Sequence, residues 1–193
     1  MTLPHVLVMI SALITLAGAS AYVKNTLSGK TKPNLVSWSL WALAPLIGAA
    51  AAMAIGADPW VTVRIFLAGF LPLLVVIASL INPHSYWKLT RFDAICGICS
   101  LAAIILWVSL DAARGAIVLA AIGDGFASLP TIRKAWQFPE TETGLAFVAS
   151  LTSTILILPS IPAWNIENSA FQIYLLIVNT ILVASVYRKR FKL

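Results

Sequence analysis

Residues 60–81 read WVTVRIFLAGFLPLLVVIASLI, and Arg64 is the only charged side chain among them. An apolar run of about 20 residues is long enough to cross the hydrocarbon core of a bilayer as an α-helix. Six other stretches have similar length and composition: residues 4–23, 35–56, 92–110, 114–131, 143–161 and 168–187. In lipid, each segment must satisfy its own backbone polar groups, and these runs are too long for barrel strands. We therefore expect an all-α integral membrane protein with seven transmembrane helices.

The composition of the whole chain agrees with this expectation. Of its 193 residues, 60% are hydrophobic and 10% are charged, whereas about a quarter of an ordinary soluble domain is charged. The formal net charge is +6, but the basic residues separate hydrophobic runs instead of forming the patch of a nucleic-acid-binding surface. Cys96 and Cys99 lie at the start of one run, so they indicate neither a disulfide framework nor a thioredoxin-like redox site.

Most lysines and arginines lie on one side of the expected spans. Eleven of the thirteen follow the first, third, fifth and seventh spans: Lys24, Lys30, Lys32, Lys88, Arg91, Arg133, Lys134, Arg188, Lys189, Arg190 and Lys192. The positive-inside rule makes this side cytoplasmic, so we expect the N-terminus outside and the C-terminus in the cytoplasm. The short loops favour a bacterial inner membrane, with an organelle membrane as the alternative.

The chain resembles itself when it is shifted by 106 residues. The aligned pairs are Pro33 with Pro139, Trp41 with Phe147, and residues 76–80 with residues 182–186. If the first basic loop is three residues longer than its counterpart, residues 22–24 also align with 131–133. We expect two parallel three-helix repeats, residues 1–84 and 112–193, the second ending in a short basic tail, with a linker helix in residues 85–111. Such repeats commonly form transporter halves around a midplane site.

A recognisable loop motif accompanies the second repeat. Residues 128–136 read SLPTIRKAW, and residues 139–145 read PETETGL. This resembles the PQ-loop signature, in which a helix ends in Pro-Gln, a basic loop follows, and Ser/Thr-Gly-Leu opens the next helix. Thr131 stands where the signature has glutamine, and the first repeat has Ala21 and Tyr22 in place of Pro-Gln. The three-one-three layout is also similar to that of SWEET sugar facilitators and their relatives, and the resemblance implies a divergent transporter without naming its solute.

Candidate substrate-binding residues follow from depth in the membrane. A side chain nine residues from the basic boundary lies about 13 Å deep, near the bilayer centre. Four polar or aromatic residues on four different spans meet this condition: Thr15, Trp41, Asp124 and Asn179. Asn34 and Trp38 share one helical face with Trp41, and Phe147 is the repeat equivalent of Trp41. We therefore expect these residues to contribute to a central pocket.

Each of these residues also has a structural interpretation. Asp124 is the only acidic residue deep in a span, where a carboxylate is costly unless it is paired, protonated or hydrated. It is a candidate for proton coupling or for anchoring solute, and hydrogen bonding to a neighbouring helix is the alternative. Trp38 alternatively belongs to the interfacial aromatic belt, Trp41 to helix packing, and Asn179 to an interhelical hydrogen bond.

Three prolines are candidate hinges or gates. Pro45, Pro72 and Pro130 lie inside spans, where each removes one helical hydrogen bond and favours a kink. Static bends that fit the bundle are the alternative.

Two further groups of charges have structural expectations. We expect Arg64 to snorkel to the outer surface or to pair with Asp58 or Asp111. We expect Glu140 and Glu142, beside Arg133 and Lys134, to form a solvated cytoplasmic charge cluster.

We expect a transporter or facilitator that moves a small polar solute by alternating access. A membrane receptor, sensor or assembly subunit with the same bundle is the alternative. An intramembrane enzyme is a remote one, because Asp93 and Asp124 differ in depth and His5 and His84 lie near opposite faces. We expect no catalytic residue, cofactor, metal or nucleic acid. The expected partners are a small solute and the lipid bilayer. The sequence leaves open whether the chain forms a homo-oligomer.

Overall fold

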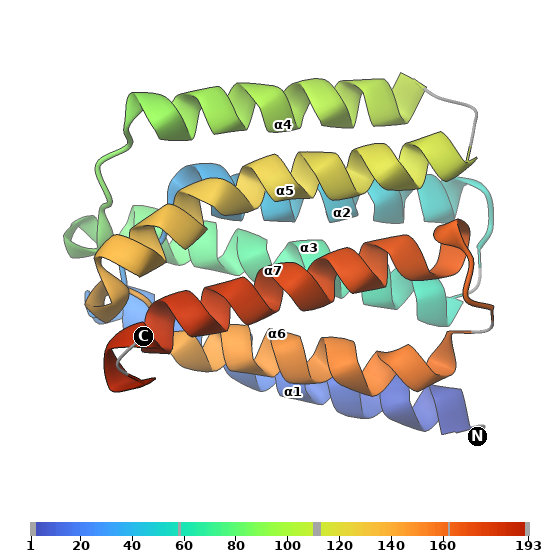
Figure 1. The fold of residues 1–193 in the computed structure, drawn as a ribbon, viewed down its shortest axis with the longest axis horizontal. Helices are drawn as coiled ribbons and strands as arrows, with labels where there is room; N and C mark the ends of the chain where they lie inside the picture. Colours follow the sequence, from blue (N-terminus) through green and yellow to red (C-terminus); the bar gives the residue numbers. More distant parts are fainter. Residues whose placement is uncertain (1–2, 58, 110–112, 162, 192–193) are drawn as a thin grey trace.

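The computed structural model describes residues 3–57, 59–109, 113–161 and 163–191, and these form a helical bundle (Figure 1). The α-helices are α1 (Leu3–Leu27), α2 (Leu35–Ala54), α3 (Pro59–Ile81), α4 (Arg91–Ser109), α5 (Ala113–Gln137), α6 (Gly144–Ile157) and α7 (Ile166–Phe191). Short 3₁₀ helices η1 (Pro83–Ser85), η2 (Pro139–Thr141) and η3 (Leu158–Ser160) lie between them. Each expected span therefore corresponds to one α-helix.

Five of the described helices are long and apolar enough to cross a membrane: His5–Leu27, Leu35–Ala54, Thr62–Ile81, Arg91–Ser109 and Asn168–Arg190. The α6 helix is shorter, and with η3 its apolar stretch runs from Gly144 to Ser160. The α5 helix is not among the five, and it carries Asp124, Arg133 and Lys134 along its length. Length and apolar composition thus suggest a membrane protein.

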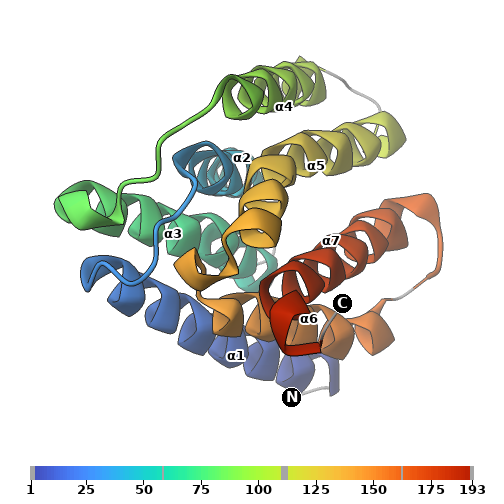
Figure 2. The same cartoon turned by 60° about the vertical axis from the view of Figure 1, so that its left-hand side comes forward.

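The first half of the chain holds α1, α2 and α3, and the second half holds α5, α6 and α7. In each half the third helix lies between the other two. The α3 helix contacts both α1 and α2, and α7 contacts both α5 and α6 (Figures 1 and 2). Two pairings join the halves, because α1 packs against α6 and α2 packs against α5. The α4 helix covers α5 and touches α2. The first helix of each half therefore contacts the second helix of the other half.

Side chains at the helix starts fix where two helices begin. Asn34 is the N-cap of α2, and its Oδ1 accepts hydrogen bonds from the backbone N–H groups of Val36 (3.1 Å) and Ser37 (3.4 Å). At the start of α4, Asp93 Oδ2 accepts hydrogen bonds from Thr90 N (2.6 Å) and Thr90 Oγ1 (2.9 Å). Such caps satisfy amides that have no partner inside the helix. The Asp93 carboxylate is thus engaged by Thr90 at the start of α4.

The prolines lie within continuous helices. Pro45 is inside α2, Pro72 inside α3 and Pro130 inside α5. Figure 2 shows α5 turning toward α6 over its last turns, the part of α5 that contains Pro130. A proline there gives the carbonyl of Phe126 no donor, which is an established cause of helix bending.

Small residues allow helices to approach closely. A Cβ atom on Gly69 of α3 would lie 2.8 Å from the Ala42 carbonyl oxygen and 2.9 Å from the Leu46 nitrogen of α2. A Cβ atom on Gly18 of α1 would lie 2.5 Å from Ala149 Cβ of α6. Close backbone approach through small residues is a usual mode of helix association in membranes. These two glycines set the spacing of α2–α3 and α1–α6.

We predict that Gly69→Ala and Gly18→Ala destabilise the bundle. Overpacking typically costs about 1–3 kcal/mol, which corresponds to a loss of roughly 3–10 °C in Tm for a chain of this size. Thermal unfolding of the purified protein in detergent measures the change. Gly48→Ala is the matched control, because its new Cβ would meet its nearest atom, Ile65 Cγ2, at 3.5 Å. Equal Tm values for Gly69→Ala and Gly48→Ala would contradict this packing.

Candidate functional site

A buried ion pair lies at the end of the bundle where α1, α3, α5 and α7 finish. We call this the basic end, because most of the lysines and arginines follow these helices. Lys134 Nζ of α5 lies 2.6 Å from Glu142 Oε1, and the two side chains are 1% and 0% exposed. Tyr22 OH of α1 donates a hydrogen bond of 2.6 Å to Glu142 Oε2. Lys134 Nζ also donates to the Thr141 carbonyl (3.3 Å) and lies 4.9 Å from the ring centroid of Trp87. One carboxylate thus connects α1, α5 and the loop before α6.

This finding corrects the expectation of a solvated charge cluster. The η2 turn folds the segment before α6 back over the end of α5, which places Glu142 in the interior. Of the two glutamates, Glu140 is the solvated one. Its Oε2 lies 3.5 Å from Lys189 Nζ, and both side chains are more than half exposed.

Hydrogen bonds between the two basic loops surround the ion pair. Thr31 Oγ1 and Thr143 Oγ1 lie 2.5 Å apart, and Asn25 Nδ2 donates to Thr143 Oγ1 at 3.0 Å. The backbone N–H of Lys32 donates to the Thr141 carbonyl at 3.0 Å. These three contacts lie at the basic end and join α1 and the loop after it to the segment before α6. We call the set formed by Tyr22, Asn25, Thr31, Lys134, Glu142 and Thr143 the basic-end latch.

Three aromatic side chains form a cluster with Tyr22 of the latch. The Tyr22 ring centroid lies 4.4 Å from that of Trp38 and 6.2 Å from that of Phe147. Trp38 in turn contacts Trp41 edge to face, with centroids 5.3 Å apart. The structure thus brings together three of the expected site residues, Trp38, Trp41 and Phe147, and adds Tyr22. Trp38 is 7% exposed, so it is not part of an interfacial belt.

Several polar atoms near this cluster are buried without a protein partner. Among the described residues, Asn34 Nδ2, Ser37 Oγ and Trp38 Nε1 on the first turn of α2 have no acceptor or donor in hydrogen-bonding geometry, and neither has Thr131 Oγ1 on α5. Asn34, Ser37 and Thr131 are fully buried. Thr131 lies one turn before Lys134, so the two residues share one face of α5. The α5 helix packs against α2. Since nearly all buried polar groups in proteins are paired, such a group marks a binding site or an ordered water.

Asp124 belongs to a separate network within the second half of the chain. Tyr174 OH of α7 donates to Asp124 Oδ2 at 2.6 Å, and Ser128 Oγ lies 3.1 Å from Tyr174 OH. Ser128 Oγ also lies 2.8 Å from the backbone carbonyl oxygen of Asp124. The carboxylate therefore meets the hydroxyl of a neighbouring helix, which is the structural alternative considered for it.

The remaining expected residues bond within their own helices. Asn179 is buried, and its Nδ2 donates to the Leu175 carbonyl at 2.9 Å. Thr15 Oγ1 donates to the Ser11 carbonyl at 2.9 Å. Neither contact places these side chains in the aromatic cluster. Arg64 is half-buried, and its expected partners Asp58 and Asp111 lie outside the described residues.

The residues that sequence reasoning missed are mainly those of the latch. Lys134 and Glu142 are eight residues apart, one on each side of a turn. This spacing is the same for a buried ion pair and for a solvated one, so the sequence does not distinguish them. The repeat alignment contained a usable signal for Tyr22, because it aligns with Thr131, which follows the proline of the motif.

The described residues contain no cluster of three or more His, Cys, Asp or Glu side chains that would hold a metal ion. Comparisons with protein-family models, curated proteins and solved structures give no match to this chain.

We predict that breaking the buried ion pair strongly destabilises the bundle. Glu142→Gln keeps an oxygen for Tyr22 but leaves the Lys134 charge unpaired, which typically costs about 3–5 kcal/mol. Thermal unfolding in detergent should show a large fall in Tm, and the double variant Lys134→Met with Glu142→Gln should recover part of it. Glu140→Gln, which breaks the exposed pair with Lys189, is the matched control and should cost at most about 1 kcal/mol. Similar losses for Glu142→Gln and Glu140→Gln would contradict the buried pair.

Proposed function

We propose that this chain is an integral membrane transporter or facilitator that moves a small polar solute by alternating access. In this proposal seven spans form two parallel three-helix repeats joined by α4, in a divergent PQ-loop or SWEET-like arrangement. The N-terminus lies outside and the C-terminus in the cytoplasm, with a bacterial inner membrane as the expected location.

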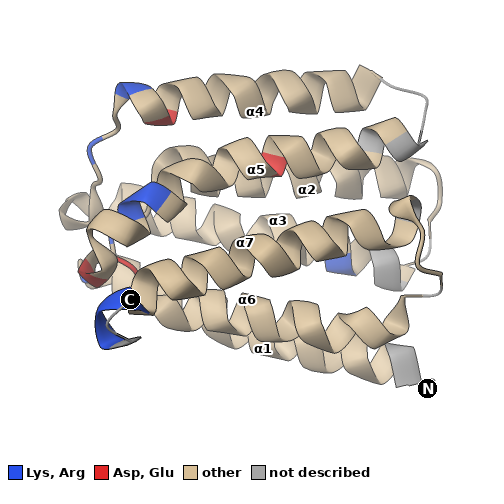
Figure 3. Ribbon diagram, in the orientation of Figure 1, with Lys and Arg blue, Asp and Glu red and all other residues tan. Residues whose placement is uncertain are grey.

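The distribution of side chains supports insertion in a membrane. Large apolar side chains are exposed on the outside of the bundle, among them Leu13 (65%), Ile98 (67%) and Ile105 (65%). Buried side chains are polar as often as they are apolar. Exposed apolar side chains on several helices fit contact with lipid. Figure 3 shows lysine and arginine gathered at the end where α5 and α7 finish, apart from one position in α3, which supports a cytoplasmic assignment for that end.

The helix contacts support the repeat. Shifting α1 by 109 residues places it on α5, and shifting α2 and α3 by 106 residues places them on α6 and α7 within about one helical turn. Two contacts join the halves: α1 with α6, and α2 with α5. If each helix is replaced by its repeat equivalent, the first contact becomes the second and the second becomes the first. A pseudo-two-fold relation between parallel repeats is typical of transporter halves.

One observation carries the functional proposal: the two repeat-related interfaces differ in hydrogen bonding. At the α1–α6 interface, Tyr22 bonds Glu142, and Asn25 bonds Thr143. The aligned positions at the α2–α5 interface are Thr131, Lys134 and Ser37. There, the hydroxyls of Thr131 and Ser37 have no partner, and Lys134 crosses to Glu142. Buried unpaired hydroxyls cost about 1–3 kcal/mol each, and a bound polar solute would offset that cost.

The latch supplies a means of controlling access to this interface. It joins the two halves at the basic end through the Tyr22–Glu142 and Thr31–Thr143 contacts, and the buried ion pair with Lys134 holds Glu142 in place for the first of them. We infer that the structure represents the state closed to the cytoplasm and that separation of Lys134 from Glu142 opens a path to Ser37 and Thr131. Trp38, Trp41 and Phe147 would then form the apolar walls of the pocket.

We predict that the latch controls access to the unpaired hydroxyls from the cytoplasmic side. In a Cys96→Ala, Cys99→Ala background, Thr131→Cys should react slowly with a membrane-impermeant maleimide applied to inverted vesicles. Adding Glu142→Gln should raise the rate at least tenfold, because weakening the closed state by roughly 1.4 kcal/mol is already enough for a tenfold effect. Ala103→Cys, buried in α4 against Gly123, is the control and should stay slow. An unchanged rate for Thr131→Cys would argue against the latch as a gate.

We further predict that Thr131→Val impairs solute handling without lowering stability. Valine keeps the shape of threonine and removes an unpaired hydroxyl, so Tm should stay equal or rise. A panel of sugars, amino acids and vitamin precursors, screened by thermal shift and followed by liposome flux, identifies the solute. Loss of one buried hydrogen bond should then weaken its binding about 5- to 100-fold.

The matched control is Thr154→Val, which removes a buried hydroxyl that bonds Ser150 within α6. It should leave binding unchanged. A solute that binds in this panel but shows no flux would favour a receptor or assembly subunit over a transporter.

A further inference from the structure

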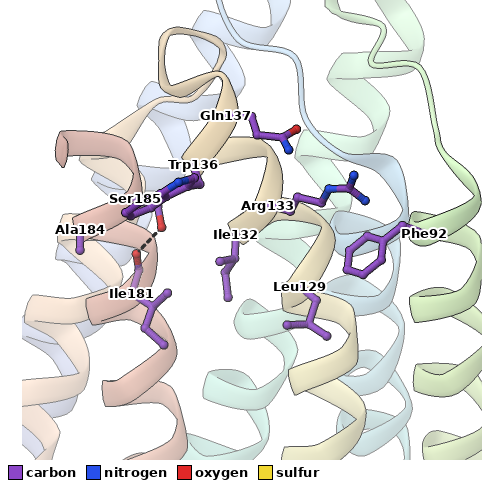
Figure 4. A pocket seen from close by; sticks show the side chains of 9 residues that line it. All are labelled: Phe92, Leu129, Ile132, Arg133, Trp136, Gln137, Ile181, Ala184 and Ser185. Atoms are coloured by element: carbon purple, nitrogen blue, oxygen red, sulfur yellow. Dashed lines mark hydrogen bonds between the residues drawn. The ribbon is translucent and has the colours of Figure 1, made fainter. Parts of the chain in front are cut away.

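A groove runs along the outer surface of α5 at its basic end. It has a volume of about 580 Å³, α5 forms its floor, and α4 and α7 form its walls (Figure 4). We call it the α5 groove, and its lining residues are Phe92, Leu129, Ile132, Arg133, Trp136, Gln137, Ile181, Ala184 and Ser185. Leu129, Ile132 and Ile181 lie toward the middle of the bundle, whereas Arg133, Trp136 and Gln137 lie at the basic end (Figure 4). The groove is thus apolar at depth and cationic at its mouth.

The cations at the mouth are held in place by aromatic rings. The Arg133 guanidinium lies 4.8 Å from the ring centroid of Phe92. The Arg188 guanidinium lies 5.1 Å from the ring centroid of Trp136, and its Nε donates to the Trp136 carbonyl at 2.6 Å. Within the described part of the chain, neither arginine forms a salt bridge. Arg133 therefore lines the groove without a salt bridge among the described residues, and Arg188, which also interacts electrostatically with Glu140, adjoins the groove through Trp136.

A second groove occupies the repeat-equivalent position on α1. It has a volume of about 310 Å³ and is lined by Leu16, Ala19, Ser20, Val23, Lys24, Leu27, Leu71 and Leu74. Under the alignment of α1 with α5, four of its residues match lining residues of the α5 groove: Ser20 with Leu129, Val23 with Ile132, Lys24 with Arg133, and Leu27 with Trp136. Both grooves therefore combine an apolar floor with a basic residue at the same end.

We propose that the α5 groove binds an acidic phospholipid of the cytoplasmic leaflet, with one acyl chain along Leu129, Ile132 and Ile181 and the phosphate at Arg133 and Arg188. This goes beyond transport and rests on the proposed insertion in a membrane. Basic pockets between helices on the cytoplasmic side suit anionic lipid head groups, and arginine binds phosphate in a bidentate manner. The Arg133 guanidinium, which forms no salt bridge among the described residues, supplies the charge complementarity together with the adjoining Arg188, and the apolar floor accounts for the acyl chain. The α1 groove, which is smaller and has one lysine, should bind the same lipid more weakly.

Purified protein in detergent, titrated with phosphatidylglycerol or with phosphatidylcholine of the same acyl chains, tests the proposal. Phosphatidylglycerol should raise the Tm by about 3 °C or more above phosphatidylcholine. Arg133→Gln should weaken the apparent affinity for phosphatidylglycerol about fivefold, the contribution expected of one basic residue near a membrane surface. Lys30→Gln, which removes the same charge from an exposed loop position, should keep the full preference.

A second pair of variants separates head-group binding from acyl-chain binding. Ala184→Phe, which fills the groove from α7, should abolish the preference, whereas Ala102→Phe on the exposed face of α4 should not. Equal shifts with the two lipids, a full preference in Arg133→Gln, or the same stabilisation by glycerol 3-phosphate alone would overturn the proposal. Extraction of the protein from membranes by alkaline carbonate would instead refute membrane insertion, which keeps the two failures distinguishable.

Discussion

The buried contact between Lys134 and Glu142 constrains the basic end of the whole bundle. Each charge alone in this interior would cost several kcal/mol, so the segment from Pro139 to Thr143 must fold over the end of α5 wherever Lys134 is buried. Glu142 in that position accepts a hydrogen bond from Tyr22, and Thr143 meets Asn25 and Thr31. The docking of α1 against α6 at this end therefore follows from the satisfaction of one carboxylate.

That arrangement also makes the two halves of the chain unequal. A symmetric bundle would place equivalent hydrogen bonds at the α1–α6 and α2–α5 interfaces. Here, Glu142 has no acidic counterpart in the first half, because Val36 occupies the aligned position. Lys134 therefore reaches across to Glu142, and the hydroxyls of Ser37 and Thr131 keep no protein partner. Under the proposed repeat, the unpaired hydroxyls of Ser37 and Thr131 thus occupy the positions that are hydrogen-bonded at the other interface, which links the latch to the candidate pocket.

The sequence predicts the helices well and the site only in part. Long apolar runs specify where helices form, because lipid or a packed bundle leaves the backbone few other options. Depth arguments placed Asp124, Asn179 and Thr15 in one pocket, but depth does not determine the direction of a side chain around the helix. Asp124 meets Tyr174, fifty residues away, and Asn179 and Thr15 bond their own helices. Trp38 and Trp41 do contact each other, because residues three apart share one face of a helix in any bundle.

Arg133 and Lys134 show why the number of charges in a loop does not distinguish a surface cation from a buried one. Both contribute equally to the positive-inside rule, but successive residues of a helix point about 100° apart. Arg133 consequently lines the exposed α5 groove, while Lys134 is 2% exposed inside the latch. Their adjacency also couples them, since any rotation of α5 that withdraws Lys134 from Glu142 also moves Arg133 relative to Phe92. If the proposed opening involves such a rotation of α5, a lipid held at Arg133 as proposed would oppose the separation of Lys134 from Glu142.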